Sequence, residues 1–489
     1  MTSLALIIAI LIPTIGGLVV LGIPFKTVRS LHVFIEGVAL ATTAVVLYMV
    51  TSISGEAQAL YTFAPGFTFA FSVDALGKLY AVLVSLMWPI VLLYAFSYME
   101  HDGRQRSFFG FYIMTYGATL GVAFSANLLT LFVFFEMLSI STLPLVSHYQ
   151  NHESLYAGRK YAAYLFGGAA LGFVPVVVAT LQGTTGLFQL GGDLTAGVDM
   201  NLMRIIYLFG FMGFGIKAAI FPFHMWLPAA SCAPTPVTAL LHAVAVVNTG
   251  VFAVIRLTYY AFGPEILKGT WVQTFCLILA SFTLLLTSVS AVRERHVKRR
   301  LAYSTVSNLS YMLFGIMLLT PEGMLAGIAH LVFHSLTKIT LFMCIGSFME
   351  HTEKAYISDV NGVGKVMPHT FACYTVSALS LLGVPLLCCF VSKWRLLVAG
   401  VEEASIAAYL GIGALLISAF LCAIYGLSVS VRAFFPVEGT NQFPDAKRNS
   451  EGGWRMLVPL YIFTICQVIF GVFPGPLLEF ITKLTEGLL

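Results

Sequence analysis

Long apolar runs, each close to the length of a membrane-spanning helix, follow one another along almost the whole chain. A helix needs about 20 apolar residues to cross the hydrocarbon layer of a bilayer, so fourteen spans use roughly 280 positions. That number matches the hydrophobic share of the chain, 58% of 489 residues, while only 10% are charged. The pattern excludes a soluble enzyme and predicts an all-α integral membrane protein with about fourteen transmembrane helices. The runs lie at residues 3–24, 31–51, 72–98, 109–125, 127–148, 161–182, 203–227, 236–260, 272–292, 303–319, 324–349, 369–399, 406–434 and 455–475.

Basic residues between the runs predict how the chain threads the membrane. Lys and Arg in short loops tend to stay on the cytoplasmic side. With the amino terminus outside, fourteen spans put seventeen of the 26 basic residues on the cytoplasmic side and both termini outside. The outer side then carries Arg204, Arg256, Lys268 and Lys483. The cytoplasmic set is Lys26, Arg29, Arg104, Arg106, Arg159, Lys160, Arg293, Arg295, Lys298, Arg299, Arg300, Lys354, Lys365, Arg432, Lys447, Arg448 and Arg455.

The first run is predicted to be a retained span. It has no basic residue before it and no clear small-residue cleavage site after it, and Lys26 and Arg29 follow at once, unlike a signal peptide. The longest polar stretch, 436–453, is predicted to be a cytoplasmic loop and is too short for a domain.

Motifs for cofactors are missing from the sequence. There is no nucleotide-binding glycine loop, haem motif or iron–sulfur pattern, and the eight Cys are scattered without a CxxC. The formal net charge is +4, and the sequence contains no basic patch of the kind that binds nucleic acid. We therefore expect no cofactor and no metal in this chain, and an energy input from an ion gradient or a partner subunit.

Glu136 is the most informative ionisable residue inside an apolar run. Such residues are costly in a membrane and usually face the protein interior or a water path. Glu136 lies in NLLTLFVFFEMLS, nine residues after Asn127, hence near the middle of its span. It is either a carboxylate that pairs with a buried cation or a protonated side chain that only packs between helices.

Lys217 is a candidate for that cation. It precedes Pro222 by five residues in GFGIKAAIFPFHMWLP, and proline breaks or kinks a helix. Helix ends freed inside a membrane can bind ions and water beside a cavity. Lys217 could instead extend to the membrane surface. His224 and Trp226 fit the membrane interface as well as an interior site.

A third group lies in HLVFHSLTK, where His330, His334 and Lys338 share one helix face at intervals of four residues. They span about 12 Å along the axis, with gaps that single waters could bridge. Histidine exchanges protons near neutral pH, so the row suits proton hopping. A zinc site is a weaker reading because no acidic or Cys ligand is near in sequence, and a purely structural trio is the remaining alternative.

Lys393 follows Pro385 by eight residues in GVPLLCCFVSKW, a segment similar in kind to the one that holds Lys217. Two broken helices, each with a buried Lys and separated by about five spans, suggest two structural repeats. The repeats are predicted to be inverted because five is odd.

These segments resemble a known family, the antiporter-like proton-conducting subunits of respiratory complex I, Mrp cation/proton antiporters and membrane-bound hydrogenases. The resemblance is carried by the motifs FSVDALGKLY (71–80), NLLTLFVFFEMLS (127–139), GIKAAIFPFHMWLPAASCAPTPVTALLHA (215–243), KRRLAYSTVSNLSYMLFG (298–315), HLVFHSLTKITLFMCIGS (330–347) and GVPLLCCFVSKW (383–394).

The resemblance implies a role for each candidate residue. Glu136 matches the family's central glutamate and Lys217 its partner in the broken seventh helix. His330, His334 and Lys338 match the connecting chain, Lys393 the terminal lysine of the broken twelfth helix, and His242 a polar-axis histidine. It also implies inverted five-helix repeats: helices 1–3 at residues 1–108, a first repeat (helices 4–8) at 109–260, a second (helices 9–13) at 271–434, and a loop with helix 14 at 435–489.

Two departures from the family pattern stand out. Many members carry a bridging lysine in the eighth helix where this chain has Asn248, which can hydrogen-bond a water wire but cannot hold an exchangeable charge. Phe135 replaces a frequent Trp. Lys393 in place of a glutamate, the PAASCAPTP stretch and an end soon after the last run make the chain most similar to the D-type component of Mrp antiporters and its hydrogenase counterparts.

The resulting hypothesis is a proton-translocating subunit of a multisubunit cation/proton antiporter or redox-driven complex, with other membrane subunits as partners. Protons would load Lys217 under the control of Glu136, pass His242, water, His334 and Lys338, and leave from Lys393. Sodium is an open second ion, and a redox complex would place electron chemistry in partner subunits. The alternatives are a non-conducting scaffold or coupling subunit, the pumping arm of a hydrogenase or complex I-like machine, and a stand-alone carrier for an organic solute.

Overall fold

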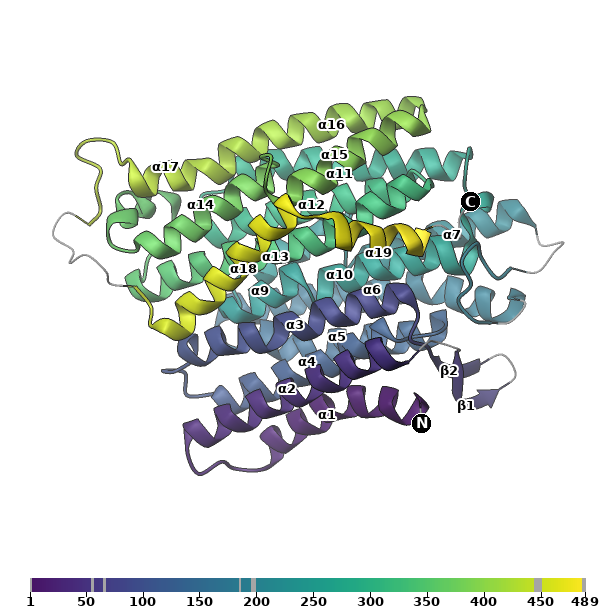
Figure 1. Cartoon of the computed structure of the whole chain (residues 1–489), viewed down its shortest axis with the longest axis horizontal. Helices are drawn as coiled ribbons and strands as arrows, with labels where there is room; N and C mark the ends of the chain where they lie inside the picture. The colour runs from purple at the N-terminus through teal and green to yellow at the C-terminus, as the bar shows by residue number, and fades with distance from the viewer. Residues whose placement is uncertain are drawn as a thin grey trace.

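The apolar runs form helices that lie side by side with their long axes in a common direction (Figure 1). The structure, a computed structural model, describes residues 2–53, 57–64, 67–183, 186–194, 199–443 and 451–485. Lys447 and Arg448, predicted for a cytoplasmic loop, lie outside the described residues. The α-helices are α1 Thr2–Gly22, α2 Val28–Ser52, α3 Ala75–Tyr98, α4 Gln105–Ala123, α5 Leu128–Val146, α6 His152–Gln182, α7 Met200–Gly215, α8 Trp226–Ala230, α9 Thr235–Ala243, α10 Val246–Ile255, α11 Trp271–Arg293, α12 Val297–Met317, α13 Pro321–Thr352, α14 Pro368–Leu382, α15 Cys388–Glu403, α16 Ile406–Cys422, α17 Ser428–Phe434, α18 Trp454–Val472 and α19 Gly475–Thr485.

Each of the fourteen predicted runs coincides with one helix or with an interrupted set of helices. The largest boundary difference is in α6, which begins at His152 instead of 161. Its start is set by Asn151, whose side chain accepts a hydrogen bond from the Ser154 N–H at 2.8 Å. Capped first turns are polar, so a hydropathy pattern places the start of such a helix too late.

Both predicted helix breaks are present. In the seventh span α7 ends at Gly215, and the chain resumes as a 3₁₀ turn, Phe223–Met225, and α8. In the twelfth span α14 ends at Leu382 and α15 begins at Cys388. Each break holds a non-glycine residue in the left-handed region, Ala219 with φ 55° and Leu386 with φ 71°.

The eighth span is also interrupted, which the sequence pattern did not predict. α9 ends at Ala243 and α10 begins at Val246. α10 then continues as a π-helical segment, Arg256–Phe262, and the thirteenth span has a π-helical segment at Ala423–Leu427. Both the proline breaks and the π-helical segments therefore recur five spans apart, which is consistent with the predicted repeats.

Two elements lie outside the predicted runs. Strands β1 (Gln58–Ala64) and β2 (Phe67–Phe71) form an antiparallel pair, in which the Thr62 and Thr68 hydroxyls are 2.8 Å apart. At the other end of the sequence, the chain continues after α18 as α19. Leu478, Ile481 and Leu484 of α19 are buried, while Glu479 and Lys483 are exposed, as expected of an amphipathic helix.

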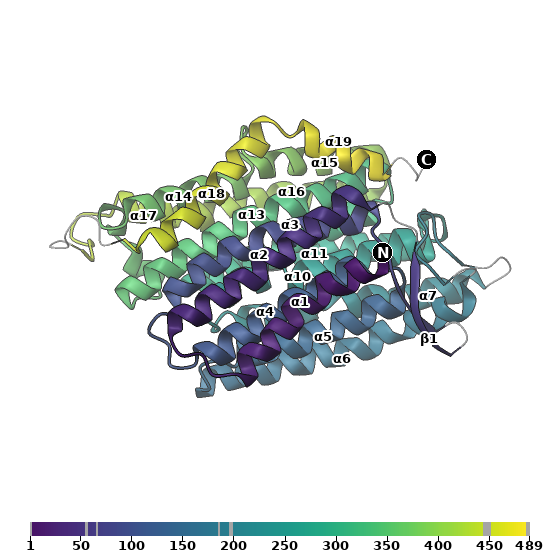
Figure 2. The ribbon, with the colours of Figure 1, turned by 60° about the horizontal axis from the view of Figure 1, so that its bottom comes forward.

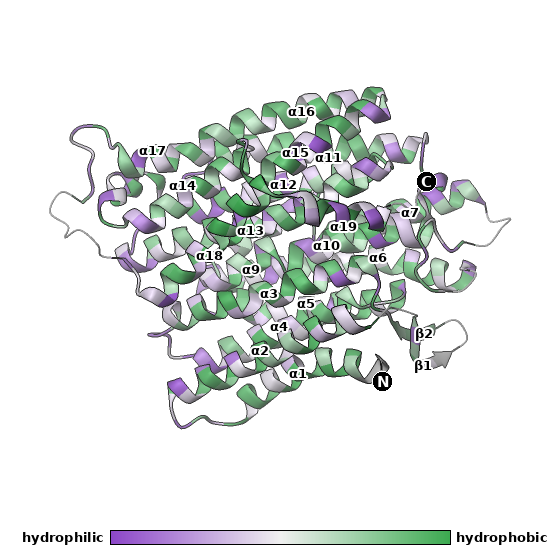
Figure 3. Ribbon diagram, in the orientation of Figure 1, coloured by the Kyte–Doolittle hydropathy of each residue, from purple (hydrophilic) through white to green (hydrophobic). Residues whose placement is uncertain are grey.

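The core of the bundle is made by two spans whose apolar windows are entirely buried, Thr235–Phe262 and Pro321–Thr352. Ten helical segments in the described part of the chain are long and apolar enough to cross a membrane. Hydrophilic residues gather toward the two ends of the bundle (Figure 3), and the chain starts and finishes at the same end (Figures 1 and 2). The protein is a multi-pass membrane protein.

Candidate functional site

The first break brings Lys217 close to α5 but not into an ion pair with Glu136. The ammonium of Lys217, which is fully buried, donates to the carbonyl oxygen of Phe135 and lies 3.5 Å from the centre of the Phe135 ring. Both carboxylate oxygens of Glu136 are buried without a hydrogen-bond partner among the described residues. Phe135, which replaces a frequent Trp of the family, is thus the residue that the lysine contacts.

The backbone around Lys217 is held by three neighbouring elements. The Trp226 indole N–H donates to the Ile216 carbonyl at 2.8 Å, and the Phe221 N–H donates to the Thr283 hydroxyl of α11 at 3.2 Å. Gly250 of α10 lies directly against the break, where an added Cβ would be 2.4 Å from the Ala218 nitrogen. A side chain at this position would push the two segments apart.

Asn248 stabilises the break in the eighth span. Its side-chain amide donates to the Ala243 carbonyl, which the break leaves without a helical partner, and to the Ser335 hydroxyl of α13, both at 2.7 Å. Tyr80 of α3 donates to the next freed carbonyl, that of Val244, at 2.9 Å. Asn248 therefore does more than replace the family's lysine, because it links the broken helix to the residue that follows His334.

His242 lies at the carboxyl end of α9, next to this break. The ring is fully buried and stacks on Phe342 of α13 with centroids 4.7 Å apart. Neither ring nitrogen has a hydrogen-bond partner among the described residues. A buried imidazole in this condition is a natural position for water.

The three predicted residues of α13 are fully buried on one face, but each has different partners. The rings of His330 and His334 are 5.8 Å apart, centre to centre. The two ring nitrogens of His330 contact the Ser392 hydroxyl at 2.9 Å and the Asn308 carbonyl oxygen at 3.2 Å. Both nitrogens of His334 are without a partner in the described part of the protein.

Lys338 forms its hydrogen bonds with α12. Its ammonium donates to the Ser304 hydroxyl and to the Leu301 carbonyl, the latter at 3.2 Å. Lys338 therefore lies on the face of α13 that the spacing predicted. The acceptors of its hydrogen bonds belong to α12.

Lys393 of α15 lies at the second break, as predicted. Its ammonium donates to the freed carbonyls of Leu381 and Leu382 at 2.6 and 3.4 Å, and lies 4.7 Å from the centre of the Tyr311 ring. The Tyr311 ring is in turn 5.6 Å from that of His330. His330 therefore connects to the Lys393 region through Tyr311 and through Ser392.

The structure thus joins the predicted residues into two groups. Glu136 and Lys217 meet around Phe135, and the three residues of α13 run toward Lys393, with His242 and Asn248 on α9 and α10 between the two groups. The polar partners Ser304, Asn308, Ser335 and Ser392 were missed. They are small neutral residues inside apolar helices, and only their position at the right rotation would have distinguished them from packing residues.

Two basic residues that the charge pattern assigned to the two sides of the membrane are buried in the protein. Arg256, predicted for the outer side, is fully buried and forms a two-pronged ion pair with Asp74, including one N···O distance of 2.6 Å. Three aromatic rings, those of Phe188, Phe252 and Tyr260, lie within 5.1 Å of its guanidinium. The pairing shows how an arginine near the end of an apolar run is held inside the protein, and it leaves the predicted outer side untested.

The second of these residues is Lys298, which belongs to the first turn of α12. It is buried, and its ammonium donates to the Ala233 carbonyl at 2.7 Å.

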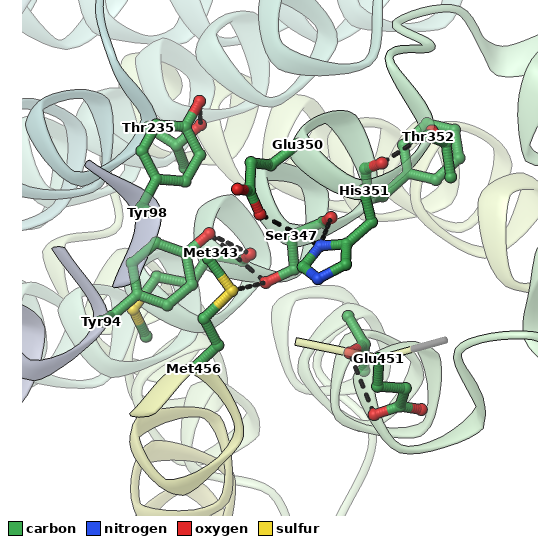
Figure 4. A network of polar contacts seen from close by, with 12 residues as sticks. Tyr94, Tyr98, Thr235, Met343, Ser347, Glu350, His351, Thr352, Glu451 and Met456 are labelled. Carbon is green, nitrogen blue, oxygen red and sulfur yellow. Dashed lines mark hydrogen bonds and ion pairs between the residues drawn. The ribbon is translucent and has the colours of Figure 1, made fainter. Parts of the chain in front are cut away.

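A further polar network joins α3, α9, α13 and α18 (Figure 4). The hydroxyl of Tyr94 donates to the Met343 carbonyl at 2.9 Å and lies 3.4 Å from that of Ser347. A ring nitrogen of His351 lies 3.1 Å from the Glu350 carboxylate. The network fixes the carboxyl end of α13, the helix that carries most of the site.

The arrangement defines the class of protein. Ionisable groups lie in a line through a buried apolar core, beside three broken helices, and this is the architecture of a membrane ion-translocating subunit. The sequence matches the family described as NADH:quinone oxidoreductase/Mrp antiporter, TM, over residues 125–426. The chain belongs to this family.

Curated relatives support the same assignment. The chain is 30% identical to the A-type component of the Na(+)/H(+) antiporter of Alkalihalophilus pseudofirmus, over 96% of this chain and 60% of the relative. It is 29% identical to the A1-type component of the Na(+)/H(+) antiporter of Staphylococcus haemolyticus (86% and 54%) and 30% identical to the A/B-type component of a probable K(+)/H(+) antiporter of Rhizobium meliloti (80% and 39%). The chain thus spans between about two fifths and three fifths of the length of these relatives. All three relatives carry A-type names, whereas the sequence motifs favoured the D-type component.

Solved structures show the same fold. The Mrp complex from Dietzia sp. has a chain that matches with a TM-score of 0.86 at 20% identity, covering 99% of this chain and 97% of that one. The archaeal membrane-bound sulfane sulfur reductase gives 0.85 at 21% (99% and 97%), and respiratory complex I from Thermus thermophilus gives 0.83 at 23% (99% and 98%). The predicted all-α membrane fold is confirmed.

Proposed function

We propose that this chain is the proton-translocating membrane subunit of a multisubunit cation/proton antiporter of the Mrp type or of a related redox-driven complex. The observation that carries the proposal is the line of ionisable side chains through the core: six of the seven candidates are at most 8% exposed. They are Lys217, His242, His330, His334, Lys338 and Lys393, and the seventh is Glu136. Placing so many ionisable groups inside an apolar bundle costs stability, which a purely structural role does not require.

Unpaired nitrogens support a path that includes water. His242 and His334 lie on facing helices, and all four of their ring nitrogens are without a protein partner in the described part of the chain. A proton can pass between such groups only through water molecules that bridge them. The amide of Asn248 borders this gap and offers a carbonyl oxygen that is also free of partners among the described residues.

Glu136 and Lys217 form the start of the proposed path. In this structure Lys217 contacts the Phe135 carbonyl and does not contact the Glu136 carboxylate. This arrangement corresponds to the open form of the pair. Closure of the pair would hold the charge on Lys217, and its opening would release the proton onward. At about 4 Å and an effective dielectric constant of 20, two unit charges interact by roughly 4 kcal/mol, enough to control occupancy.

The contacts favour one order at the far end. His330 adjoins Lys393 through Ser392 and Tyr311, and Lys338 lies at the opposite end of the three-residue row, against α12. Protons would therefore move from Lys338 or His242 through His334 and His330 to Lys393. This order revises the sequence-based hypothesis, in which Lys338 came directly before Lys393.

The membrane placement is part of the proposal. We assign the chain to the cytoplasmic membrane with both termini outside, so that the arginine-rich corner between α11 and α12 faces the cytoplasm. The common end of the two termini supports this topology. We retain the predicted division at 1–108, 109–260, 271–434 and 435–489, because the interruptions recur in the two proposed repeats. Other membrane subunits are the partners, and sodium or potassium, named for the relatives, would be the exchanged cation.

Proton transport in everted vesicles that contain the complete complex tests the proposal. The driving gradient is applied and the internal pH is followed with a dye, for the wild-type complex and for Glu136→Gln. Glu136→Gln keeps the size of the side chain and removes its charge, so transport should fall at least tenfold. Glu36→Gln is the matched control, since Glu36 lies in another apolar span, on α2. Wild-type transport by Glu136→Gln would refute the gating role.

The identity of the complex requires a separate measurement. Mass spectrometry and metal analysis of what co-purifies from the native membrane in mild detergent distinguish the two classes. Small hydrophobic antiporter subunits without iron or nickel would establish a gradient-driven antiporter. Iron–sulfur subunits would make the chain the pumping arm of a redox machine.

A further inference from the structure

An arginine-lined cavity lies apart from the polar axis, at the end of the bundle opposite the termini. It has a volume of about 570 Å³ and is open to the outside, where the corner between α11 and α12 meets the turn Ile357–Val360 and α17. Half of its eight lining residues are arginines, and Tyr356 and Ser358 are among the others. The arginines are Arg293, Arg295, Arg300 and Arg432.

The chain offsets the positive charge of this cavity only in part. None of the four arginines forms an ion pair within the described residues. The two nearest acidic residues in the sequence are used by the backbone. Glu294 accepts the N–H groups of Arg295 and His296 at 2.9 Å, and Asp359 accepts that of Tyr356 at 3.0 Å. Four like charges around one cavity repel each other unless an anion lies between them.

Arg300 lines the cavity and is held in place by hydrogen bonds to the surrounding chain. Its guanidinium donates to the carbonyls of Val292, Glu294 and Tyr425 and to the Ser428 hydroxyl, at 3.0–3.2 Å. It thereby ties the α11–α12 corner to the π-helical part of the thirteenth span, and it is a positioning residue. The side chains of Arg293, Arg295 and Arg432 are exposed and can turn toward an occupant.

The cavity lies at the level of the membrane surface. α11 ends at Arg293 and α12 begins at Val297, so the corner between them marks the edge of the apolar layer. On α17 and just beyond it, Val431 and Phe435 are 55% and 78% exposed beside Arg432. A phosphate among the arginines would thus have exposed apolar side chains beside it, as an acyl chain requires.

We propose that this cavity binds the phosphate of an anionic phospholipid headgroup. Arginine pairs with phosphate through two parallel hydrogen bonds, and its charge is retained at any physiological pH. Basic pockets between transmembrane helices on the cytoplasmic side suit such headgroups. The apolar surface of α17 favours a lipid over a soluble phosphate or an acidic segment of a partner. The site is independent of the proposed proton path, and its bound lipid would brace the thirteenth span through Arg300.

The test measures lipid binding to the purified, delipidated complex by native mass spectrometry. Phosphatidylglycerol, phosphatidylcholine and inorganic phosphate are titrated separately into wild type, the double variant Arg295→Gln/Arg432→Gln and the control Arg159→Gln, an exposed arginine outside the cavity. We expect phosphatidylglycerol to bind wild type and the control alike. Each arginine removed should weaken binding about fivefold, and the double variant about 25-fold.

Three results would overturn the proposal. Unchanged phosphatidylglycerol binding by the double variant would place the lipid elsewhere. Equal binding of inorganic phosphate would identify a soluble anion site. Crosslinking from Ser358→Cys to an acidic segment of another subunit in the native complex would show a protein occupant. Melting of the double variant at the wild-type temperature without lipid confirms that loss of binding is not misfolding.

Discussion

His330 and His334 offer a direct test of whether the polar axis exists for function, because their hydrogen bonding differs while their burial does not. Each is fully buried on α13, one turn apart. His330→Leu would lose two hydrogen bonds, each with a net value of about 1 kcal/mol, and would leave the Asn308 oxygen unpaired at a further cost of roughly 1–3 kcal/mol. The unfolding free energy should fall by about 3–5 kcal/mol.

His334→Leu should behave differently. The ring nitrogens of His334 have no partner among the described residues, so the substitution removes no protein hydrogen bond. Only the ring contact with His330 at 5.8 Å is lost, at a cost of roughly 1 kcal/mol. Leucine carries no exchangeable proton, so transport should fall at least tenfold, which corresponds to about 1.4 kcal/mol in the barrier.

Two assays on the same preparations separate these effects. Thermal unfolding is followed through the reactivity of the eight free cysteines, six of which are buried, and transport through the internal pH of everted vesicles. His330→Leu should melt well below wild type, and His334→Leu within a few degrees of it but without transport. His101→Leu, at an exposed position, is the control. Wild-type transport by His334→Leu would refute the relay, and a large loss of stability by the same variant would show that His334 is a structural residue.

The remaining predictions concern Lys338, the ion pair of Asp74 with Arg256, and Asn248. Lys338→Met should abolish proton transport in everted vesicles, while Lys365→Met, at an exposed position, should leave it unchanged. Wild-type transport by both variants would favour a non-conducting scaffold subunit. Asp74→Asn should lower the unfolding free energy by about 3–5 kcal/mol, since it leaves Arg256 charged and buried without its partner. Adding Arg256→Met to the same chain should restore much of the lost stability. A double variant as unstable as Asp74→Asn would contradict this reason. Asn248→Leu should cost roughly 2–3 kcal/mol of unfolding free energy for two lost donors and should also slow transport; a melting temperature equal to wild type would show that the break does not need the amide.

The proline breaks show what could be predicted along the chain. Pro222 and Pro385 interrupt apolar runs, and α7 and α14 end before them, as expected of a residue that lacks an N–H donor. Proline alone does not set a break, because Pro89 and Pro175 lie inside continuous helices. The break between α9 and α10 has no such signal, since the chain there reads Ala243, Val244 and Ala245. That break is stabilised by Asn248 and Tyr80, the second of which comes from α3.

The candidate site shows the same division. The interval of four residues sufficed to place His330, His334 and Lys338 on one face of one helix, since helical periodicity is a local property. It did not show that Lys338 would contact Ser304 of α12 or that His334 would have no protein partner among the described residues.

The sequence by itself determined that this protein lies in a membrane, where its helices run and which ionisable residues are inside them. These properties follow from hydrophobicity and helical period, which add up along a segment regardless of what surrounds it. Only the tertiary structure decided that Lys217 meets Phe135, that Asn248 bridges to Ser335, and that Arg256 is buried against Asp74. Such pairings depend on how each helix is rotated and packed against helices that are distant in sequence.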